Sequence, residues 1–501
     1  MIAKTRQATA IELDRGPWRW RDRVHWVVPG LLILLGIGLR AWGLSRNSLD
    51  LDEIWSYRAA AMDWSGLLDW TIHDISHPPL SYALFKLALG VSDGSVGAVR
   101  LVSLIAGTVT LLVTWGLCET LRLRLRETGL ALFMVAVNGY FIEYAQYLRM
   151  FALLQAMSLL SLWLFVRALD RSRPRGPAIV LLTLANILLV YSHYWGWFFV
   201  GIEGLWALLM ARRLLAPMIL SALVTVAAFA PWVYVVAGAV RAHGAATDQI
   251  AWMERPQYID ILWLIDRMNG SQLWPKATLV GLVLFGLPIA AWLLKLLITR
   301  RPDRLVLPLV LIAFWAIPIG VTFWVSHSLD RPVWGARHLI IAAVPYLILA
   351  SIAANRLIPG RIGLVLPALL ALWAGTASIE ALTAPGDRSF AWDDVIARIR
   401  QQDGAGTEPI TLFTPEIFVT MPSQFYGDRL GGRALAVSTD EAFDHADGSH
   451  FWVLYRVELW QGDRTPRAVL EARGFHVGDG FVAHSRFQTL MVLPVDRESH
   501  P

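Results

Sequence analysis

The sequence predicts an α-helical protein that crosses a membrane many times and ends in a small α/β domain. Of its 501 residues, 56% are hydrophobic and 17% are charged, whereas soluble domains carry about 25% charged residues. Its 24 tryptophans agree with this class, because Trp is enriched at membrane interfaces. The formal net charge of +5 comes from short basic clusters between apolar runs, which indicates membrane topology and argues against nucleic-acid binding.

Eleven apolar windows are interpreted as membrane spans, because about 17–25 such residues cross a bilayer. The stretch 177–210 is read as two spans, with one long helix as the alternative. Two spans are favoured because they place every short arginine-rich connection on one side, which the positive-inside rule makes cytoplasmic. The windows lie within residues 27–44, 98–121, 129–169 (two), 177–210 (two), 218–240, 277–299, 305–325, 339–354 and 362–382.

This topology divides the chain into three parts. Residues 1–24 form a cytoplasmic N-terminal segment, 25–384 the membrane domain, and 385–501 a C-terminal segment on the outer side. In the last segment, helical patterns alternate with strand patterns, which predicts a small α/β domain. The helical patterns lie at 390–400 and 468–473, and the strand patterns at 410–413, 451–455 and 489–493.

The outer connection 45–97 carries an acidic motif directly after the first span. Asp50, Asp52 and Glu53 lie within four positions of one another beside the membrane. A carboxylate held there is suited to deprotonate an acceptor hydroxyl as a general base. The alternative is an ordinary acidic loop in which Asp50 caps a helix.

The outer connections also supply cations, imidazoles and phenols. An arginine there can bind a phosphate with two parallel hydrogen bonds. The alternatives are a membrane-boundary role for Arg149, extension of Lys86 to the lipid headgroups and a structural role for His193. Glu203 lies inside a span, where an acid is a functional candidate or pairs with a neighbouring helix. The outer-face candidates are His77, Tyr82, Lys86, Tyr144, Arg149, His193, Tyr194, Arg337 and His338.

Other classes of site are disfavoured. The cytoplasmic connections contain no P-loop, no GxGxxG and no acidic motif, which argues against an enzyme that uses nucleotides or nucleotide sugars. The single cysteine, Cys118, excludes an intrachain disulfide and a Cys-based metal site.

Several short motifs follow one another along the chain. They are Leu51-Asp52-Glu53 with Ser56, His77-Pro78-Pro79-Leu80, Arg100-Leu101-Val102-Ser103, Tyr144-Ala145-Gln146 with Arg149, Ser192-His193-Tyr194, Arg337-His338, and Trp392-Asp393 in the helix expected at 390–400. In this order they resemble the motifs of bacterial GT-C glycosyltransferases related to the dolichyl-phosphate-mannose–protein mannosyltransferases (glycosyltransferase family 39-like). The chain departs from that pattern at Tyr147, where an acid is frequent, and at Phe151, where Tyr is frequent.

The resemblance implies a GT-C membrane fold and a reaction at the outer face of a bacterial inner membrane. A sugar would pass, with inversion, from a polyprenyl-phosphate donor to a hydroxyl of a glycolipid, glycan or protein of the cell envelope, such as lipopolysaccharide. Asp52 matches the general base, and Glu53 would support it. The departing phosphate would be held by Arg149, Arg337, Lys86 and His338. Substrate contacts are implied for Asp50, His77, Tyr82, Tyr144, His193 and Tyr194. The polyprenyl tail would lie in a groove among membrane lipids.

The acidic motif could also hold a metal. A divalent cation, Mg²⁺ or Mn²⁺, would find oxygen ligands in it, but the motif alone does not establish a metal site.

The function has two alternatives. A transporter or flippase for lipid-linked sugars would use the same residues for binding alone, although such proteins frequently contain internal repeats and none is visible here. A non-catalytic envelope-assembly protein would not need Asp52.

Overall fold

The computed structural model describes residues 21–45, 47–92, 94–243, 253–270, 278–299, 305–383, 390–404, 410–429, 435–438, 450–460, 462–485 and 488–497. Most of the predicted cytoplasmic segment 1–24 lies outside these residues. The chain divides into two compact units. The first consists of Met1–Trp42 and Ala59–Thr383, and the second of Gly43–Arg58 and Ala384–Pro501.

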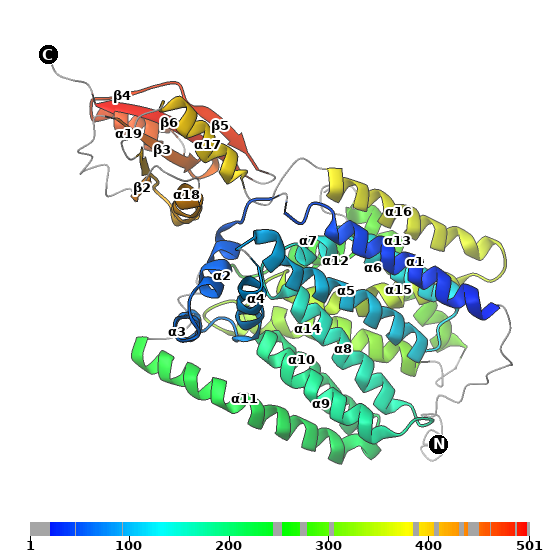
Figure 1. Cartoon of the computed structure of the whole chain (residues 1–501). Helices are drawn as coiled ribbons and strands as arrows, with labels where there is room; N and C mark the ends of the chain where they lie inside the picture. Colours follow the sequence, from blue (N-terminus) through cyan, green and yellow to red (C-terminus); the bar gives the residue numbers. More distant parts are fainter. Residues whose placement is uncertain are drawn as a thin grey trace. The chain divides into compact units, whose positions relative to one another are not determined.

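The first unit is a helical bundle, and each predicted span lies on one of its helices (Figure 1). In the described part of the chain, seven helices are long and apolar enough to cross a membrane, and the bent pair α6–α7 would make eight. The predicted spans at α1, α10 and α16 fall on shorter apolar stretches. The prediction of a polytopic helical membrane protein is therefore confirmed. The helices are α1 (Arg21–Ala41), α5 (Val96–Thr120), α6 (Leu125–Val137), α7 (Gly139–Ala145), α8 (Phe151–Leu169), α9 (Arg175–Ser192), α10 (Trp197–Leu209), α11 (Leu215–His243), α13 (Thr278–Ile298), α14 (Val306–Ser328), α15 (Ala343–Leu357) and α16 (Val365–Thr383).

The stretch 177–210 forms two helices, as predicted. α9 ends at Ser192, and His193 then has an extended backbone (φ −168°, ψ 148°). A single 3-10 turn, Tyr194–Gly196, leads into α10. A glycine is needed at 196 because a Cβ there would lie only 2.7 Å from the Leu189 side chain. α10 packs against α11 and α14. The break at His193 therefore lets α10 run as a helix of its own and not as a continuation of α9.

The connections that the sequence places on the outer side contain short helices. They are α2 (Leu51–Ala61), α3 (Trp64–Asp74), α4 (Leu80–Gly90) and α12 (Tyr258–Met268) (Figure 1). The residues expected to carry the chemistry lie on these helices, near the N-terminal ends of α8 and α15, and near the C-terminal end of α9.

A buried arginine stabilises the bend of 54° between α6 and α7. The Arg40 guanidinium is inaccessible to solvent. It donates to the carbonyls of Val135 (2.9 Å) and Ala136 (2.8 Å) and, on its own helix, of Gly36 (3.0 Å). Because α6 ends at Val137, the carbonyls of its last turn lack helical partners and carry the negative end of the helix dipole. Arg40 satisfies both demands.

Glu203 is buried between three helices of the bundle. Its two carboxyl oxygens lie 2.5 Å from Ser161 Oγ on α8 and 2.7 Å from Asn186 Nδ2 on α9, and Ser161 Oγ lies 2.7 Å from Asn186 Oδ1. Ser161 has one hydroxyl hydrogen but faces two acceptor oxygens. One of its two contacts therefore needs a proton on Glu203, and a neutral Glu203 closes a ring of three hydrogen bonds. The paired alternative for this intramembrane acid is the one that the structure shows.

We expect Glu203→Gln to unfold at nearly the wild-type temperature, because the Gln amide can donate to Ser161 and accept from Asn186. Glu203→Leu leaves the buried Asn186 amide without its acceptor, which costs about 1–3 kcal/mol. Thermal unfolding of the detergent-solubilised protein measures both effects. Infrared spectroscopy of the wild type should show the carbonyl band of a protonated carboxylic acid that Glu203→Gln lacks. Strong destabilisation by Glu203→Gln, or no such band, would mean that Glu203 is ionised.

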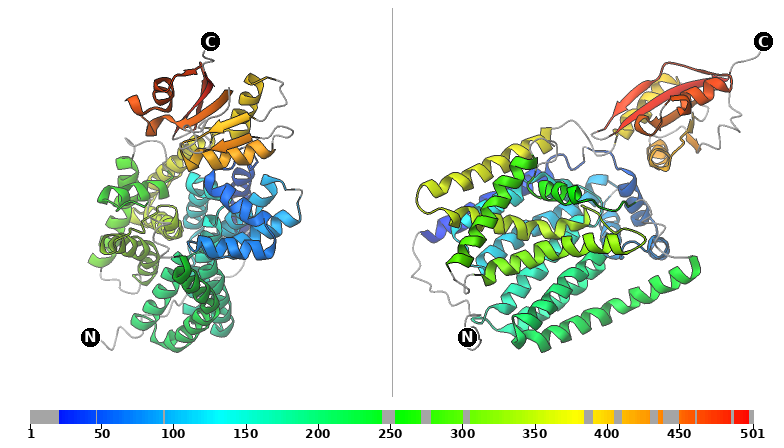
Figure 2. Two further views of the ribbon diagram at one scale, coloured as in Figure 1. Left: turned by 90° about the vertical axis from the view of Figure 1, so that its left-hand side faces the viewer. Right: turned by 180° about the vertical axis from the view of Figure 1, so that it is seen from behind.

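The C-terminal part of the second unit contains one mixed sheet and the helices α17, α18 and α19 (Figure 2), and most of α2 also belongs to this unit. β1 (Ile410–Phe413) pairs in parallel with β2 (Leu435–Ser438) and β3 (His450–Arg456). β6 (Thr489–Arg497) is antiparallel to β3, β4 (Phe475–Val477) and β5 (Phe481–His484). The helices are α17 (Trp392–Gln402), α18 (Ile417–Arg429) and α19 (Pro466–Ala472). The predicted α/β fold is confirmed, and its three predicted strands and two predicted helices are present. β2, β4, β5 and α18 were not predicted.

Candidate active site

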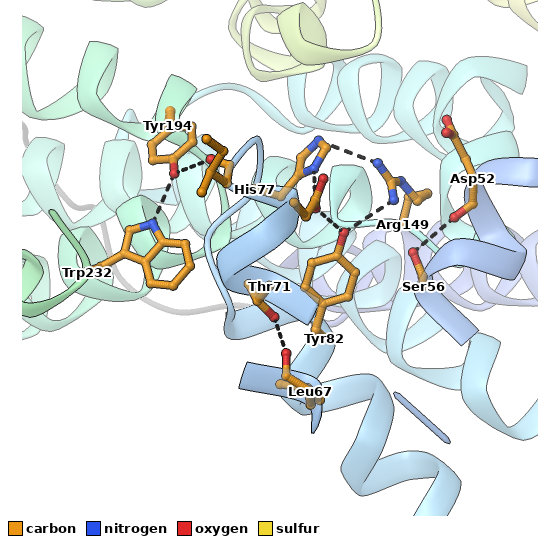
Figure 3. A network of polar contacts seen from close by, with 11 residues as sticks. Asp52, Ser56, Leu67, Thr71, His77, Tyr82, Arg149, Tyr194 and Trp232 are labelled. Atoms are coloured by element: carbon orange, nitrogen blue, oxygen red, sulfur yellow. Dashed lines mark hydrogen bonds and ion pairs between the residues drawn. The ribbon is translucent and has the colours of Figure 1, made fainter. Parts of the chain in front are cut away.

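In the first unit, Arg149 belongs to a closed ring of four polar side chains (Figure 3). Asp74, at the end of α3, accepts from Tyr82 OH (2.7 Å) and from His77 Nδ1 (3.0 Å). Arg149 Nη1 lies 3.5 Å from Tyr82 OH, and its Nη2 lies 3.5 Å from His77 Nε2. The carboxylate therefore orients the arginine through a phenol and an imidazole and not through a direct ion pair. Arg149 is 5% exposed, so its charge acts where water screens it little.

The environment of Asp74 favours its ionised form. Burial acts to raise the pKa of this carboxyl, but the His77 and Arg149 charges and the hydrogen bonds from His77 and Tyr82 outweigh burial and hold the pKa below its ordinary value. Asp74 is thus an anion that holds the ring together near neutral pH.

The lowered pKa of Asp74 predicts a pH-dependent contribution to stability. Ionised Asp74 stabilises the fold fully above its unfolded pKa of about 3.9, and this contribution is lost as the pH falls through the lower folded value. We expect Asp74→Asn to lower the unfolding temperature by a constant amount near neutral pH, and the difference from wild type to shrink in acid. Thermal unfolding over pH tests this, with the exposed Asp69→Asn as the control. A difference that does not change with pH would contradict the ionised ring.

His193 presents a buried hydrogen-bond donor. The Trp195 backbone N–H donates to His193 Nδ1 (3.2 Å), so the hydrogen of the neutral ring lies on Nε2. Burial, followed by the charges of His77, Arg149 and Arg337, holds the pKa of His193 well below its ordinary value, so the ring is neutral. Nε2 is buried and has no hydrogen-bond partner among the described residues. A buried donor without an acceptor is rare in native proteins and suits a ligand oxygen.

A second histidine lies against the first. The rings of His338 and His193 are 4.9 Å apart, and the Trp195 ring lies 4.6 Å from His338. His338 Nδ1 is also buried and without a hydrogen-bond partner within the described part of the chain. Gly335 makes room for this ring, because a Cβ at 335 would overlap the imidazole.

Phe151 connects the histidine pair to the remaining cation. Its ring centroid lies 5.6 Å from that of His338, and the Arg337 guanidinium carbon lies 5.5 Å from the Phe151 centroid on the ring face. Tyr144 packs edge-on against the same phenyl ring at 5.1 Å. Phe151, where Tyr is frequent in the resembled family, thus works here as an apolar contact between the charged and aromatic residues of the site.

Tyr194 fixes the loop that carries His77 (Figure 3). Its hydroxyl donates to the Ile75 carbonyl (2.8 Å) and accepts from Trp232 Nε1 (3.0 Å). Burial raises the pKa of Tyr194 to about 12, against a smaller effect of the Trp232 hydrogen bond. Ile75 has a positive φ of 27°, which is strained for a β-branched residue. The role of Tyr194 in the structure is therefore to hold a strained turn.

We call His77, Tyr82, Arg149, His193, Arg337 and His338, with Asp74, the cationic cluster. Sequence reasoning named all of them except Asp74, whose only signal was its position three residues before His77. Lys86 was expected with them, but its described contacts lie elsewhere: it donates to the Met62 carbonyl and its Nζ lies 5.4 Å from the Trp64 ring centroid. Trp195 and Trp232 were not singled out, because nothing distinguishes them among 24 tryptophans.

In the second unit, the acidic motif opens helix α2. Asp50 Oδ1 accepts from the Glu53 backbone N–H (2.9 Å), and Glu53 Oε2 accepts from the Asp50 backbone N–H (3.4 Å). This reciprocal pair is a capping box, so the alternative of Asp50 as a helix cap is confirmed. Asp52 takes no part in the box, is half-buried and lies in the first turn of α2, where the helix dipole favours a carboxylate. The Ser56 hydroxyl donates to its carbonyl (3.1 Å).

The three acids do not form a metal-binding group. Among the described residues, no three His, Cys, Asp or Glu side chains are arranged to hold a metal ion together. Asp50 and Glu53 instead bind backbone amides of their own helix turn.

Comparison with known proteins identifies the fold. No protein-family model matches the sequence, and no curated protein sequence matches it. Among solved structures, the chain is similar to ArnT from Cupriavidus metallidurans without ligand (TM-score 0.59, 13% identity, 94% of this chain and 98% of that chain). It is also similar to the same protein bound to undecaprenyl phosphate (TM-score 0.56, 13% identity, 93% and 98%).

An archaeal structure has the same architecture. The oligosaccharyltransferase AglB from Archaeoglobus fulgidus, in complex with an inhibitory peptide and a dolichol-phosphate, matches with a TM-score of 0.52 at 13% identity, over 88% of this chain and 70% of that chain. At these identities the likeness concerns the fold. The chain therefore has the membrane fold of the GT-C glycosyltransferases.

Proposed function

We propose that the protein transfers a sugar from a polyprenyl-phosphate-linked donor to an acceptor hydroxyl, with inversion at the sugar carbon. The observation that carries this is the cationic cluster. It brings two arginines together with two buried imidazoles that each have a ring nitrogen without a partner among the described residues. Such a set of donors fits a phosphate group.

The fold supports the same ligand class. Two of the similar structures contain a polyprenyl phosphate: undecaprenyl phosphate in ArnT and dolichol-phosphate in AglB. In the present chain, the phosphate of such a lipid would be bound by Arg149, Arg337 and His338, with His193 Nε2–H as a further donor. Lys86, whose contacts are with Met62 and Trp64, is left out of this set.

The proposed reaction is a single displacement at C1 of the sugar. The acceptor oxygen attacks C1 of the sugar while its proton passes to the Asp52 carboxylate, and the bond from C1 to the phosphate oxygen breaks. The electron pair of that bond leaves with the polyprenyl phosphate. The acceptor oxygen therefore attacks one face of C1 while the phosphate leaves from the opposite face, which inverts this carbon. Positive charge around the departing phosphate stabilises the transition state, and such electrostatic terms are frequently the largest in catalysis. Glu53 keeps the helix turn of Asp52 in place.

We further propose that this reaction takes place at the outer face of a bacterial inner membrane. Along the sequence, arginine-rich connections alternate with the connections that carry the site residues, so the predicted spans put the two kinds on opposite sides. The positive-inside rule makes the arginine-rich side cytoplasmic. The acceptor would then be a glycolipid, glycan or protein of the cell envelope.

A donor panel tests the proposed function. Purified protein is incubated with polyprenyl-phosphate sugars and membrane extract, and mass spectrometry follows free polyprenyl phosphate. We expect release from one class of donor, together with a product that is heavier by the sugar. Donor binding without release from any member of the panel would instead indicate a carrier of lipid-linked sugars.

A further inference from the structure

The acidic motif is part of the C-terminal α/β unit. Gly43–Arg58 and Ala384–Pro501 form one compact unit, although most of the membrane helices separate them in sequence. Residues three to five positions before and after Asp52, namely Ser48, Leu49 and Tyr57, make contacts that join these two segments. This gives the α/β unit a direct connection to the residue proposed as the base.

Ser48 caps a helix of the α/β unit. Helix α17 begins after Ala391, which has no side chain that can cap it. Ser48 Oγ takes this place: it accepts from the Trp392 backbone N–H (3.0 Å) and donates to Asp393 Oδ1 (2.5 Å). The amides in the first turn of a helix lack helical acceptors, and the Ser48 hydroxyl supplies one to Trp392, whose N–H also donates to the Phe390 carbonyl (2.8 Å). This acceptor comes from a segment far away in the sequence.

Tyr426 holds the next residue. Its hydroxyl, on α18, accepts from the Leu49 backbone N–H, and Leu49 is completely buried. Burial raises the pKa of Tyr426 to about 12, so the hydroxyl stays protonated at physiological pH. On the other side of Asp52, the Tyr57 ring packs edge-on against Phe425 at 5.4 Å. The turn that carries Asp52 is thus anchored to α17 and α18 by the residues before it and to α18 by Tyr57 after it.

We propose that the C-terminal α/β unit positions Asp52 for proton transfer, with Ser48 and Tyr426 as the positioning residues. Ser48 and Leu49 fix the chain that enters the capping box, the box fixes the first turn of α2, and that turn fixes the direction of the Asp52 side chain. This inference rests on the proposed function, in which Asp52 is the base. It assigns the α/β unit a role in the chemical step in addition to any role in acceptor binding.

Steady-state kinetics with the donor identified in the panel test this role. Tyr426→Phe removes the acceptor of the Leu49 N–H, and Ser48→Ala removes the two hydrogen bonds to Trp392 and Asp393; both substitutions keep most of the packing. We expect each to lower kcat about threefold to tenfold with the donor KM and the unfolding temperature near their wild-type values. Ser48→Thr keeps the hydroxyl and should restore turnover. Tyr455→Phe is the matched control, because it makes the same change in a buried tyrosine of β3 that has no described contact with residues 43–58.

A double-mutant cycle separates positioning from a general structural effect. If Tyr426 acts through Asp52, Tyr426→Phe should have no further effect on the residual turnover of Asp52→Asn. An inactive Asp52→Asn with wild-type kcat in both Tyr426→Phe and Ser48→Ala would overturn the positioning role alone. Additive losses in the cycle would overturn it too. Wild-type turnover in Asp52→Asn would overturn the proposed function itself. If Tyr426→Phe does not fold, Ser48→Ala with its Ser48→Thr rescue decides the matter.

Discussion

Asp52→Asn is expected to lower turnover by about 10²- to 10⁴-fold, the usual contribution of a general base. The substitution keeps the size of the side chain and its place in the first turn of α2, but an amide cannot accept the acceptor proton. The affinity for donor lipid should stay at its wild-type value, because the phosphate is assigned to residues of the other unit. Release of polyprenyl phosphate in single-turnover experiments, with donor binding measured separately, checks both parts.

A matched control removes a similar charge elsewhere. Asp394 is exposed on α17 of the same unit, and Asp394→Asn should leave turnover unchanged. Wild-type turnover in Asp52→Asn would exclude this residue as the base and favour a non-catalytic role. Equal losses in both variants would point to the total charge of the unit and not to proton transfer.

Arg149→Ala should weaken donor binding about ten- to a hundredfold, because hydrogen bonds to charged groups contribute about 1.5–3 kcal/mol each. The effect should be larger than for an exposed ion pair, since Arg149 is 5% exposed. Arg149→Lys should recover only part of the affinity, because an ammonium lacks the planar fork of donors that a phosphate accepts. Titration with fluorescent or radiolabelled polyprenyl phosphate measures these affinities.

Two effects of Arg149→Ala have to be separated: disruption of the ring of side chains around Asp74, and loss of the phosphate contacts. Asp74→Asn weakens the ring but leaves the guanidinium in place, so it should reduce donor affinity less than Arg149→Ala does. Arg212→Ala, in an exposed arginine of the connection between α10 and α11, serves as the charge control. Donor affinity that survives Arg149→Ala, with a lowered unfolding temperature, would assign Arg149 to the membrane boundary and not to the ligand.

Hydropathy alone predicts most of this fold, because the bilayer sets a fixed length for each span. The interruption at His193 was also predictable, since Tyr191–Gly196 is a polar and aromatic stretch inside an apolar one. What the pattern does not encode is which distant backbone a side chain reaches. Ser48 caps a helix that begins 344 residues later, and no local signal marks a cap that comes from another segment.

The same limit applies to the candidate site. Histidines and arginines in the connections predicted to be outer were identifiable by position, and five of them meet in the cationic cluster together with Tyr82. Asp74 was passed over because its role depends on Tyr82 and Arg149, which other helices bring to it. Lys86 was expected to hold the phosphate with these residues, and its described contact is with the Met62 carbonyl. Its part in phosphate binding stays a prediction.

Arg40 sets a condition on how the protein is assembled in its membrane. An unpaired guanidinium is costly to bury in lipid, and the two carbonyls on α6 that accept from it belong to residues 95 and 96 positions further along the chain. While the nascent chain is still short, the C-terminal end of α1 has to keep this side chain in contact with water. Only after α6 has been inserted does α1 find the acceptors that let it settle to its final depth. Biogenesis of the bundle therefore depends on a long-range pairing of its first helix, and a ribosome-bound fragment that ends before α6 should leave Arg40 accessible to water-soluble reagents.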